Sequence, residues 1–365
     1  MRRWMAPSAR QRMRQHVRAG ALGMLWLALS GWLLVGLAGC AAGSPVSARS
    51  APTATLAPAP TLPLPPMLGA YHIFVSDLVS GDVYSLGAQT DTAARSTHGL
   101  GLSPDGKSLY VTDVNSDRLL VFHLDGGRLS DPHVVRVGAQ PVHMVASPNG
   151  RYVFVTNFSG ASVSVVDTTT WRVARTIQTP AAPHSIVLSP DGRYIYVACY
   201  LGAAVAIIDV AQQAVVGTIP LPPQARPYGL NISRDGRYLY ASDNFSGRLF
   251  TLDATARRAI TSTQVGLRPA LIARSPDGAT LYVANGASHN LSILDIASDP
   301  AAPRVIATTQ LEGYPHGVSV TPDGRYVVVA DTVSGNVSIV DALSHQVIAT
   351  VTGMKYPNDT LALAA

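Results

Sequence analysis

A unit of 42 to 46 residues recurs through most of this chain and limits what it can fold into. Ser-Pro-Asp-Gly turns or close variants mark the unit, centred on Asp105, Asn149, Asp191, Asp235, Asp277 and Asp323. A β-rich segment such as 110–113 follows each turn, and then an alternating segment such as 163–167 that ends in Asp. Short strands separated by turn residues predict an all-β fold. Four strands in each unit of this length are typical of a β-propeller blade.

The number of blades follows from the length of the repeated region. A seventh β-rich segment, 74–77, precedes the first turn, so residues 70–365 hold seven units of about 42 residues. The first unit lacks an inner strand, and residues 356–364 repeat the pattern of residues 314–320. We therefore expect a seven-bladed β-propeller of four-stranded antiparallel blades over residues 70–365. The C-terminal strand is expected to enter the first blade and close the ring, which leaves no open sheet edge.

The repeats resemble the YVTN family of bacterial and archaeal propellers over residues 70–365. In that family an inner strand leads into Ser-Pro-Asp-Gly, then Tyr-Val-x-Asn, then Val-Ser-Val-Ile-Asp and an outer strand. Tyr282-Val-Ala-Asn285 and Val337-Ser-Ile-Val-Asp341 carry the second and third of these motifs here. The resemblance implies the propeller fold. A WD40 propeller is not expected, because no Trp-Asp pair occurs in the chain.

The first 69 residues have the pattern of an export signal and a spacer. Six arginines precede residue 20, and residues 19–37 are apolar, as in a secretory signal. The segment ends in Leu37-Ala38-Gly39-Cys40, which resembles the lipobox of bacterial lipoproteins and implies a signal peptide over 1–39 and acylation of Cys40. An uncleaved transmembrane anchor is the alternative. Residues 40–69, rich in Ala, Pro, Ser and Thr, predict a disordered, extended linker. We expect the protein to be extracytoplasmic and lipid-anchored to a bacterial membrane, in the periplasm or at the cell surface.

Charge and composition exclude several functional classes. Without residues 1–39, 21 Lys and Arg remain against 22 Asp and Glu, a net charge of −1 in place of +5. No nucleic acid partner is expected, because such a partner requires a basic surface on the folded domain. The two cysteines, Cys40 and Cys199, cannot build a disulfide framework or a Cys-based zinc cluster.

Most acidic residues have structural positions in the repeat. Aspartates at the turns and at the ends of the second and third strands recur from unit to unit, which favours a role in hydrogen bonding to the backbone. The aspartates outside this pattern are Asp82, Asp91, Asp117, Asp131, Asp299 and Asp359. No Gly-x-Ser-x-Gly elbow and no Asp-rich calcium loop occurs. Glu312, Asp113 and Asp243 are poor candidates for catalytic acids, so we assign no catalytic residue.

Histidines gather at one repeat position. The residues expected to open the inner strands and surround the central channel are His98, His143, His184, Tyr228, Ala270, His316 and Asn358. Arg226 and Arg268 precede prolines on the same rim. The predicted ligand-binding residues are therefore His98, His143, His184, Tyr228, His316, Arg226 and Arg268. As an alternative, His98, His143, His184 and His316 would bind copper or zinc, since imidazole suits both metals. A purely structural role for these repeat histidines is the other interpretation.

Three functions remain open on this evidence. The first is a non-catalytic module that binds an envelope protein, peptide or glycan through the channel-mouth face, as a monomer; on this interpretation the chain is not an enzyme. The second is a periplasmic copper-type or redox-linked protein that uses the histidines. The third is a lactonase-like hydrolase, a function that seven-bladed propellers also support, although fold alone is a weak argument for it. No cofactor is required by the sequence, and a haem would be non-covalent because no Cys-x-x-Cys-His motif occurs. We adopt the first.

Overall fold

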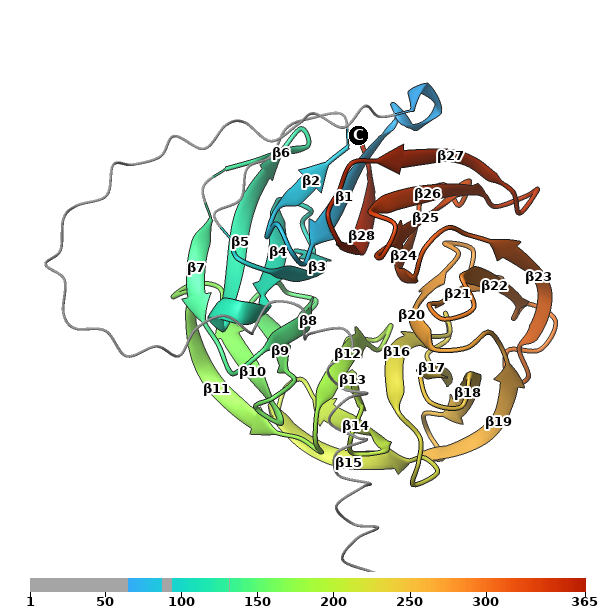
Figure 1. Cartoon of the computed structure of the whole chain (residues 1–365). Helices are drawn as coiled ribbons and strands as arrows, with labels where there is room; N and C mark the ends of the chain where they lie inside the picture. The colour runs from blue at the N-terminus through green and yellow to red at the C-terminus, as the bar shows by residue number, and fades with distance from the viewer. Residues whose placement is uncertain (1–64, 87–93, 131) are drawn as a thin grey trace, which may run out of the picture. The chain divides into compact units, whose positions relative to one another are not determined.

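The structure is a computed structural model that describes residues 65–86, 94–130 and 132–365. Within this part of the chain, 28 β-strands form seven antiparallel sheets arranged as blades around a central axis (Figure 1). The predicted all-β, seven-bladed propeller is confirmed. The predicted signal peptide, Cys40 and most of the predicted linker lie outside the described residues. In the residues that are described, no helix is both long and apolar enough to cross a membrane.

The strands follow the repeat from blade to blade. Blade one contains β1 (Tyr71–Asp77), β2 (Val83–Ser85) and β28 (Pro357–Ala364), and blade two contains β3 (Thr97–Leu102), β4 (Ser108–Asp113), β5 (Arg118–Asp125), β6 (Arg128–Leu129) and β7 (His133–Arg136). Blade three consists of β8 (Pro141–Ala146), β9 (Tyr152–Asn157), β10 (Ser162–Asp167) and β11 (Arg172–Gln178). Blade four consists of β12 (Pro183–Leu188), β13 (Tyr194–Cys199), β14 (Ala204–Asp209) and β15 (Ala214–Pro220). Blade five consists of β16 (Pro227–Ile232), β17 (Tyr238–Asp243), β18 (Arg248–Asp253) and β19 (Arg258–Gln264). Blade six consists of β20 (Pro269–Arg274), β21 (Thr280–Asn285), β22 (Asn290–Asp295) and β23 (Arg304–Gln310). Blade seven is β24 (Pro315–Val320), β25 (Tyr326–Asp331), β26 (Asn336–Asp341) and β27 (Val347–Thr352).

Packing between blades explains the hydrophobic pattern of the strands. Every residue of β14, a third strand, is buried, because both faces of a blade pack against neighbouring blades. The outer strand β11 is largely exposed, because it lies at the perimeter. One core cluster joins Tyr196 and Val205 of blade four to Leu239 and Leu252 of blade five. Burial of such side chains contributes about 1.5–3 kcal/mol each and holds the blades in place.

The turn between the first and second strands of each blade has the structure that its sequence predicts. In blade four, Asp191 Oδ1 accepts hydrogen bonds from Ser189 Oγ at 2.5 Å and from the Arg193 amide at 3.0 Å. The hydrogen bond from Ser189 lowers the pKa of Asp191. Gly192 has φ of 71°, which a residue without Cβ adopts readily. The turn aspartates are therefore structural, as the repeat indicates.

The C-terminal strand closes the ring as expected. Strand β28 pairs with β1 in antiparallel register, with Tyr71 opposite Ala364 and Phe74 opposite Leu361. This pairing joins residues nearly 300 positions apart and supplies the inner strand that blade one lacks in sequence (Figure 1). The first and last strands of the chain are thereby held together within blade one by backbone hydrogen bonds.

Two blades depart from four strands within the described residues. Blade one shows three strands there, and the residues that follow β2 in sequence, 87–93, are not described. In blade two the outer position is divided, because β7 pairs with Arg118–Val121 of β5 and the short β6 pairs with its end at Leu124 and Asp125. Glycines 126 and 127, with φ of 50° and 79°, allow the tight reversal between β5 and β6.

The N-terminal end of the described chain packs on the propeller. The 3-10 helix η1 (Pro66–Leu68) lies within the segment predicted as linker, and Leu68 is fully buried in a cluster with Ile73 and Val351. A second 3-10 turn, η2 (Val114–Ser116), connects β4 to β5. Cys199 is also fully buried, and burial raises the pKa of its thiol to about 12, so it behaves as a small core residue.

Candidate functional site

The predicted channel residues form one cluster where the inner strands begin. The ring centroid of His98 lies 5.1, 5.6 and 5.9 Å from those of His143, His184 and His316. The Tyr228 ring lies 3.7 Å from His184 and 5.6 Å from His316. All four histidines are buried, with 8% or less of their surface exposed. The repeat therefore brings together five side chains that are far apart in sequence.

The register of His143 differs from the sequence expectation by one residue. Pro141 pairs with Asn157 in blade three, just as Thr97 pairs with Asp113 in blade two. Val142 is thus the counterpart of His98, and His143 occupies the position of Gly99. In blade one this second position holds Asp359, because Pro357 pairs with Asp77. His143 and Asp359 consequently occupy equivalent positions on their inner strands, one residue further along than the other three histidines.

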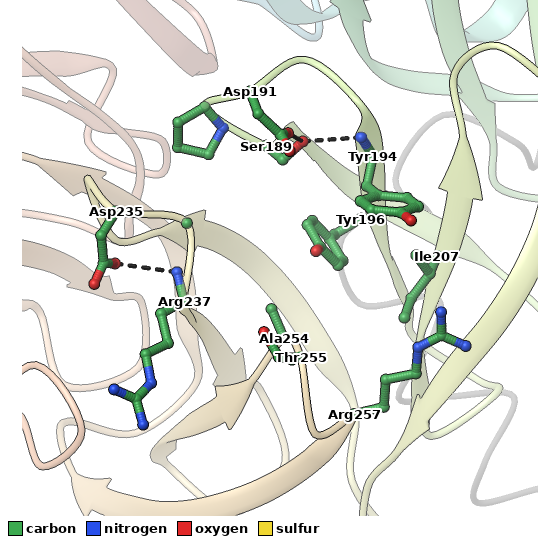
Figure 2. A pocket seen from close by; sticks show the side chains of 12 residues that line it. Ser189, Asp191, Tyr194, Tyr196, Ile207, Asp235, Arg237, Ala254, Thr255 and Arg257 are labelled. Atoms are coloured by element: carbon green, nitrogen blue, oxygen red, sulfur yellow. Dashed lines mark hydrogen bonds between the residues drawn. The ribbon is translucent and has the colours of Figure 1, made fainter.

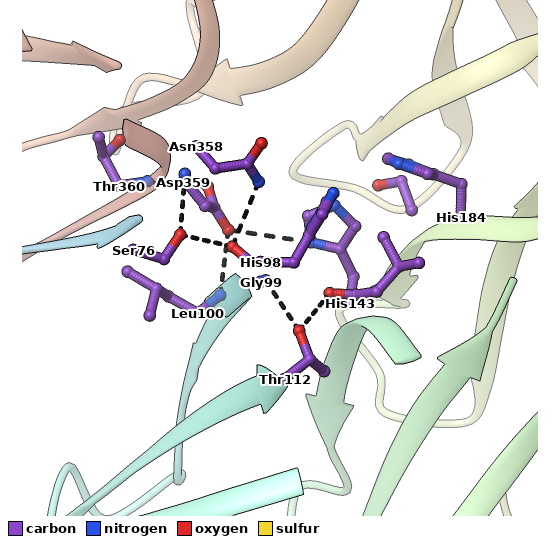
Figure 3. A network of polar contacts seen from close by, with 12 residues as sticks. Ser76, His98, Gly99, Leu100, Thr112, His143, His184, Asn358, Asp359 and Thr360 are labelled. Atoms are coloured by element: carbon purple, nitrogen blue, oxygen red, sulfur yellow. Dashed lines mark hydrogen bonds and ion pairs between the residues drawn. The ribbon is translucent and has the colours of Figure 1, made fainter. Parts of the chain in front are cut away.

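Buried hydroxyl groups hold the inner strands in place at these positions. The Ser76 hydroxyl accepts a hydrogen bond from the Asp359 amide at 3.0 Å and donates one to the His98 carbonyl of the next blade at 2.6 Å (Figure 3). Thr112 and Thr156 make the same pair of bonds between blades two and three and between blades three and four. Each hydroxyl links two inner strands, which fixes the backbone of the channel residues. Ser242 repeats the arrangement between blades five and six.

Hydrogen bonds define the tautomer of two histidines. His316 Nδ1 lies 2.9 Å from the Asn358 carbonyl oxygen, which can only accept, so Nδ1 carries the proton. His316 Nε2 then accepts from the Tyr228 hydroxyl at 2.9 Å. His184 Nδ1 donates in the same way to the Tyr228 carbonyl at 3.2 Å. Both nitrogens of His316 are therefore committed, whereas His98 Nδ1 and His143 Nε2 are buried without a hydrogen-bond partner in the described structure.

Burial keeps the imidazoles neutral. Loss of solvent lowers the pKa of His143 to about 3 and that of His316 to about 4. The pKa values of His98 and His184 are lowered well below their usual range, first by burial and then by neighbouring histidines. At neutral pH the cluster is uncharged and presents N–H donors and nitrogen lone pairs.

The copper or zinc alternative gains no support from the geometry. Over the residues that the structure describes, no three His, Cys, Asp or Glu side chains are arranged to hold one metal ion. His316 in particular uses both of its nitrogens in hydrogen bonds to Asn358 and Tyr228.

Asp359 is the site residue that the sequence analysis did not select. Its side chain is buried, and Oδ2 lies 3.8 Å from His143 Nδ1 (Figure 3). Burial raises the pKa of Asp359 to about 7. A signal was present in the sequence, because Asp359 lies outside the repeated aspartate positions and stands where other blades have Gly99, Gly229 or Gly317. Its relevance depends on the approach to His143, which the repeat alignment does not specify.

The three acidic residues considered as catalytic acids in the sequence analysis form hydrogen bonds or ion pairs outside the histidine cluster. Asp113 accepts from Arg118 at 2.5 Å, and Asp243 accepts from the Arg226 amide at 2.6 Å. Glu312 is exposed and accepts from Asn336 at 3.2 Å. None of these bonds involves the imidazole cluster.

Aromatic and cationic side chains surround the cluster on the same face. Phe158 lies 6.1 Å from both His184 and Tyr200, and Tyr200 lies 5.8 Å from Tyr228. Burial raises the pKa of the Tyr200 and Tyr314 hydroxyls, and the positive charge of Arg268 opposes this shift in both. One guanidinium therefore acts on tyrosines from two different blades.

The second predicted arginine is partly engaged. The Arg226 side chain donates to the Ala225 carbonyl at 2.9 Å, and its charge also opposes the pKa increase of Tyr200. Both predicted arginines are partly exposed. This face thus combines neutral, buried imidazoles with two arginine side chains and several aromatic rings. Such an arrangement suits a polar ligand that bears a negative charge.

A separate pocket of about 580 Å³ lies between blades four and five (Figure 2). Its lining includes Asp191, Asp235, Arg237 and Arg257. His184 lies near the start of β12, whereas Ser189, which lines this pocket, directly follows the end of that strand. The pocket and the histidine cluster therefore lie at opposite ends of β12. Asp191 and Asp235 each accept hydrogen bonds within their own turns. We therefore place the candidate site at the channel mouth.

Comparison with known proteins identifies related sequences and folds. The family described as lactonase, 7-bladed β-propeller, matches residues 84–255 and 244–347. A 6-phosphogluconolactonase of Enterobacter sp. (strain 638) is 38% identical over 73 residues, a segment that spans 19% of this chain and 22% of that protein. The periplasmic gluconolactonase of Pseudomonas aeruginosa superposes with a TM-score of 0.70 and 23% identity, covering 80% of this chain and 99% of that one. Hydrazine synthase of Kuenenia stuttgartiensis superposes with a TM-score of 0.65 and 21% identity, covering 75% and 91% of the two chains.

The family match corrects two expectations from the sequence. A match to a lactonase family across most of the propeller makes the expectation of a non-catalytic binding or scaffolding module wrong, and with it the expectation that the chain is not an enzyme. The error arose because the search for a catalytic signature relied on short linear motifs. In a propeller, a site at the centre of the ring is assembled from side chains of different blades, so it leaves no short linear motif in the sequence.

Proposed function

This chain belongs to the family of seven-bladed β-propeller lactonases, and on that premise we propose that it hydrolyses a lactone at the channel mouth. The observation that carries the proposal is the family match over residues 84–347, which includes all four clustered histidines. The 73-residue similarity to a 6-phosphogluconolactonase supports the same reaction class. The solved structures support the fold alone.

The chemistry of the site suits ester hydrolysis. Opening a lactone requires donors for the negative charge that develops on the carbonyl oxygen and a group that takes a proton from water. Neutral imidazoles can supply an N–H donor without the cost of burying a charge. The buried surroundings strengthen such a hydrogen bond, because the local dielectric is low.

The rim suits a sugar-derived lactone. The rings of Phe158, Tyr200 and Tyr228 form aromatic surfaces above and beside the imidazoles. Arg268 and Arg226 would hold a carboxylate or phosphate on the substrate, because guanidinium binds both with two parallel hydrogen bonds. We expect an anionic lactone to bind more tightly than a neutral one of the same ring.

The protein is proposed to act outside the cytoplasm. The arginine-rich and apolar N-terminal segment and the sequence Leu37-Ala38-Gly39-Cys40 support export and acylation at Cys40. The linker up to residue 65 would hold the propeller domain away from the membrane.

The test is turnover of defined lactones. Residues 41–365 are incubated with glucono-1,5-lactone, its 6-phosphate and an aliphatic δ-lactone, and acid release is followed in a pH-stat with uncatalysed hydrolysis subtracted. We expect saturable hydrolysis of at least one sugar lactone, which His184→Ala reduces. Rates for all three lactones equal to the uncatalysed rate would contradict the proposal.

A further inference from the structure

The closing strand brings a carboxylate into the imidazole cluster. Asp359 comes from β28, whereas His98 and His143 come from blades two and three. Asp359 Oδ2 accepts a hydrogen bond from the Leu100 amide at 3.1 Å, and Oδ1 accepts from the Thr360 amide at 2.9 Å. These two bonds orient the carboxylate towards β3 and leave further lone pairs on both oxygens.

Gly99 makes the approach between Asp359 and His143 possible. A Cβ on Gly99 would lie 2.9 Å from His143 Nδ1 and 2.2 Å from the Val142 carbonyl oxygen, so any side chain there would displace the imidazole or the backbone. Because Gly99 has no side chain, the His143 ring extends across β3, and its Nδ1 lies 3.8 Å from Asp359 Oδ2 (Figure 3). That distance exceeds a direct hydrogen bond. A water about 2.8 Å from each atom can contact both from the side.

We propose that Asp359 is the general base of this enzyme, with His143 as the residue that positions the attacking water. This inference rests on the proposed lactone hydrolysis and adds the group that carries out its proton transfer. The water oxygen bonds to the lactone carbonyl carbon as one of its protons passes to Asp359 Oδ2. The bond from the carbonyl carbon to the ring oxygen then breaks, and protonated Asp359 returns the proton to that oxygen. The products are a carboxylic acid, which ionises in solvent, and a hydroxyl group.

The surroundings of Asp359 set its protonation. The titratable groups on neighbouring strands are His98 on β3, His143 on β8, His316 on β24, Tyr326 and Asp331 on β25, and Tyr71, His72 and Asp77 on β1, of which Tyr71 and His72 pair with the far end of β28. The three histidines are neutral at pH 7, since burial lowers their pKa values. Asp77 Oδ2 accepts from the Lys355 and Tyr356 amides. Burial therefore dominates and raises the pKa of Asp359 to about 7, close to the value at which a general base works best.

Asp331 offers a matched control. It is also fully buried, and burial likewise raises its pKa to about 7. It accepts from Ser338 Oγ at 2.5 Å, at the end of the second strand of blade seven. Of the two, Asp359 is the one that lies against a central imidazole, at 3.8 Å from His143 Nδ1.

The experiment compares Asp359→Asn with Asp331→Asn on the lactone that the wild-type protein hydrolyses. We expect Asp359→Asn to lose at least 100-fold in kcat with a KM within about threefold, since general base catalysis contributes about 10²–10⁴-fold. Asp331→Asn should keep kcat within about threefold. His143→Gln should lower kcat less than Asp359→Asn and shift the pH profile.

The pH profile gives a second readout that does not require Asp359→Asn to fold. In Asp331→Asn, kcat/KM should rise with pH through a single step near pH 7, which marks ionisation of Asp359. A flat profile between pH 6 and 8, or a folded Asp359→Asn with more than a tenth of the wild-type kcat, would overturn the assignment while leaving the lactonase proposal intact. A wild-type protein inactive on every lactone would overturn both.

Discussion

Thr156 Oγ1 donates a 2.7 Å hydrogen bond to the carbonyl oxygen of His184 in the next blade. The same hydroxyl accepts from the His143 amide at 3.1 Å. One buried side chain thereby sets the spacing of two channel histidines that belong to different sheets. Because Ser76, Thr112 and Ser242 form equivalent links, the site geometry is built into the packing of blade against blade.

Replacement of Thr156 by valine should destabilise the propeller by about 3 kcal/mol. Valine keeps the shape, but the His184 carbonyl and the His143 amide lose their partner in a buried position, at about 1–3 kcal/mol for each such group. Chemical unfolding measures the loss, and Thr156→Ser, which keeps the hydroxyl, is the control. Equal stability of the valine and serine variants would show that the link contributes nothing.

Deletion of residues 356–365 should lower the melting temperature by several degrees or prevent folding. Without β28, strand β1 loses its inner partner and blade one is left with an open edge. The deletion also removes Asp359, so the loss of ring closure and the loss of activity should coincide. Circular dichroism melting tests the structural part. A melting curve unchanged from that of the full-length propeller would contradict the closure.

Asp331→Asn should stabilise the protein increasingly as the pH rises from about 4 to about 7. The folded-state pKa of Asp331, about 7, is higher than the value of about 4 expected in the unfolded chain. The folded state therefore retains a proton that the unfolded state loses, and the contribution of Asp331 to wild-type stability falls through this window by up to about 1.4 kcal/mol per pH unit. Asparagine does not titrate, so the variant escapes that loss.

Unfolding midpoints in urea at pH 4, 5, 6 and 7 measure the effect. The exposed Asp125→Asn provides the control, whose stability should follow that of the wild type at each pH. A constant difference between Asp331→Asn and wild type over this range would mean that Asp331 titrates normally.

Arg268→Gln should weaken binding of anionic lactones selectively. Removing a charged hydrogen bond costs about 1.5–3 kcal/mol, which corresponds to a KM about 10- to 150-fold higher for a phosphorylated or carboxylated lactone. The KM for a neutral lactone should stay within about threefold. Steady-state kinetics with glucono-1,5-lactone and its 6-phosphate separates the two cases. Arg258→Gln, at the exposed first residue of the outer strand β19, is the control. Parallel KM increases for both substrates would exclude an anion-binding role.

Cys40→Ala should abolish acylation of the exported protein. The thiol is the acceptor of lipid in the lipobox that residues 37–40 resemble. Cells that express the full chain are labelled with a palmitate analogue, and the protein is isolated from the membrane fraction. We expect label in the wild type and none in the variant, with Cys199→Ala retaining it. Labelled Cys40→Ala would contradict the lipoprotein hypothesis.

The sequence by itself determined the architecture. A turn that recurs every 42 to 46 residues specifies strands, blade count and ring closure, because each unit must bury its apolar faces against the next. The same repeat was sufficient to place His98, His184, Tyr228 and His316 at one face. In a propeller, equivalent positions in different units are related by rotation about one channel, so repeat alignment predicts proximity.

The tertiary structure alone decided which polar groups act together. His143 is one residue away from the expected register, so it occupies the strand position of Asp359 and not that of His98, although its ring also contacts that of His98. Asp359 enters the channel because β28 pairs with β1 across nearly the whole chain, and because Gly99 leaves space for an imidazole to pass. These relations depend on strand register and on contacts between blades. A repeat describes one blade at a time, whereas the electrostatic environment of Asp359 is produced by four blades packed around it.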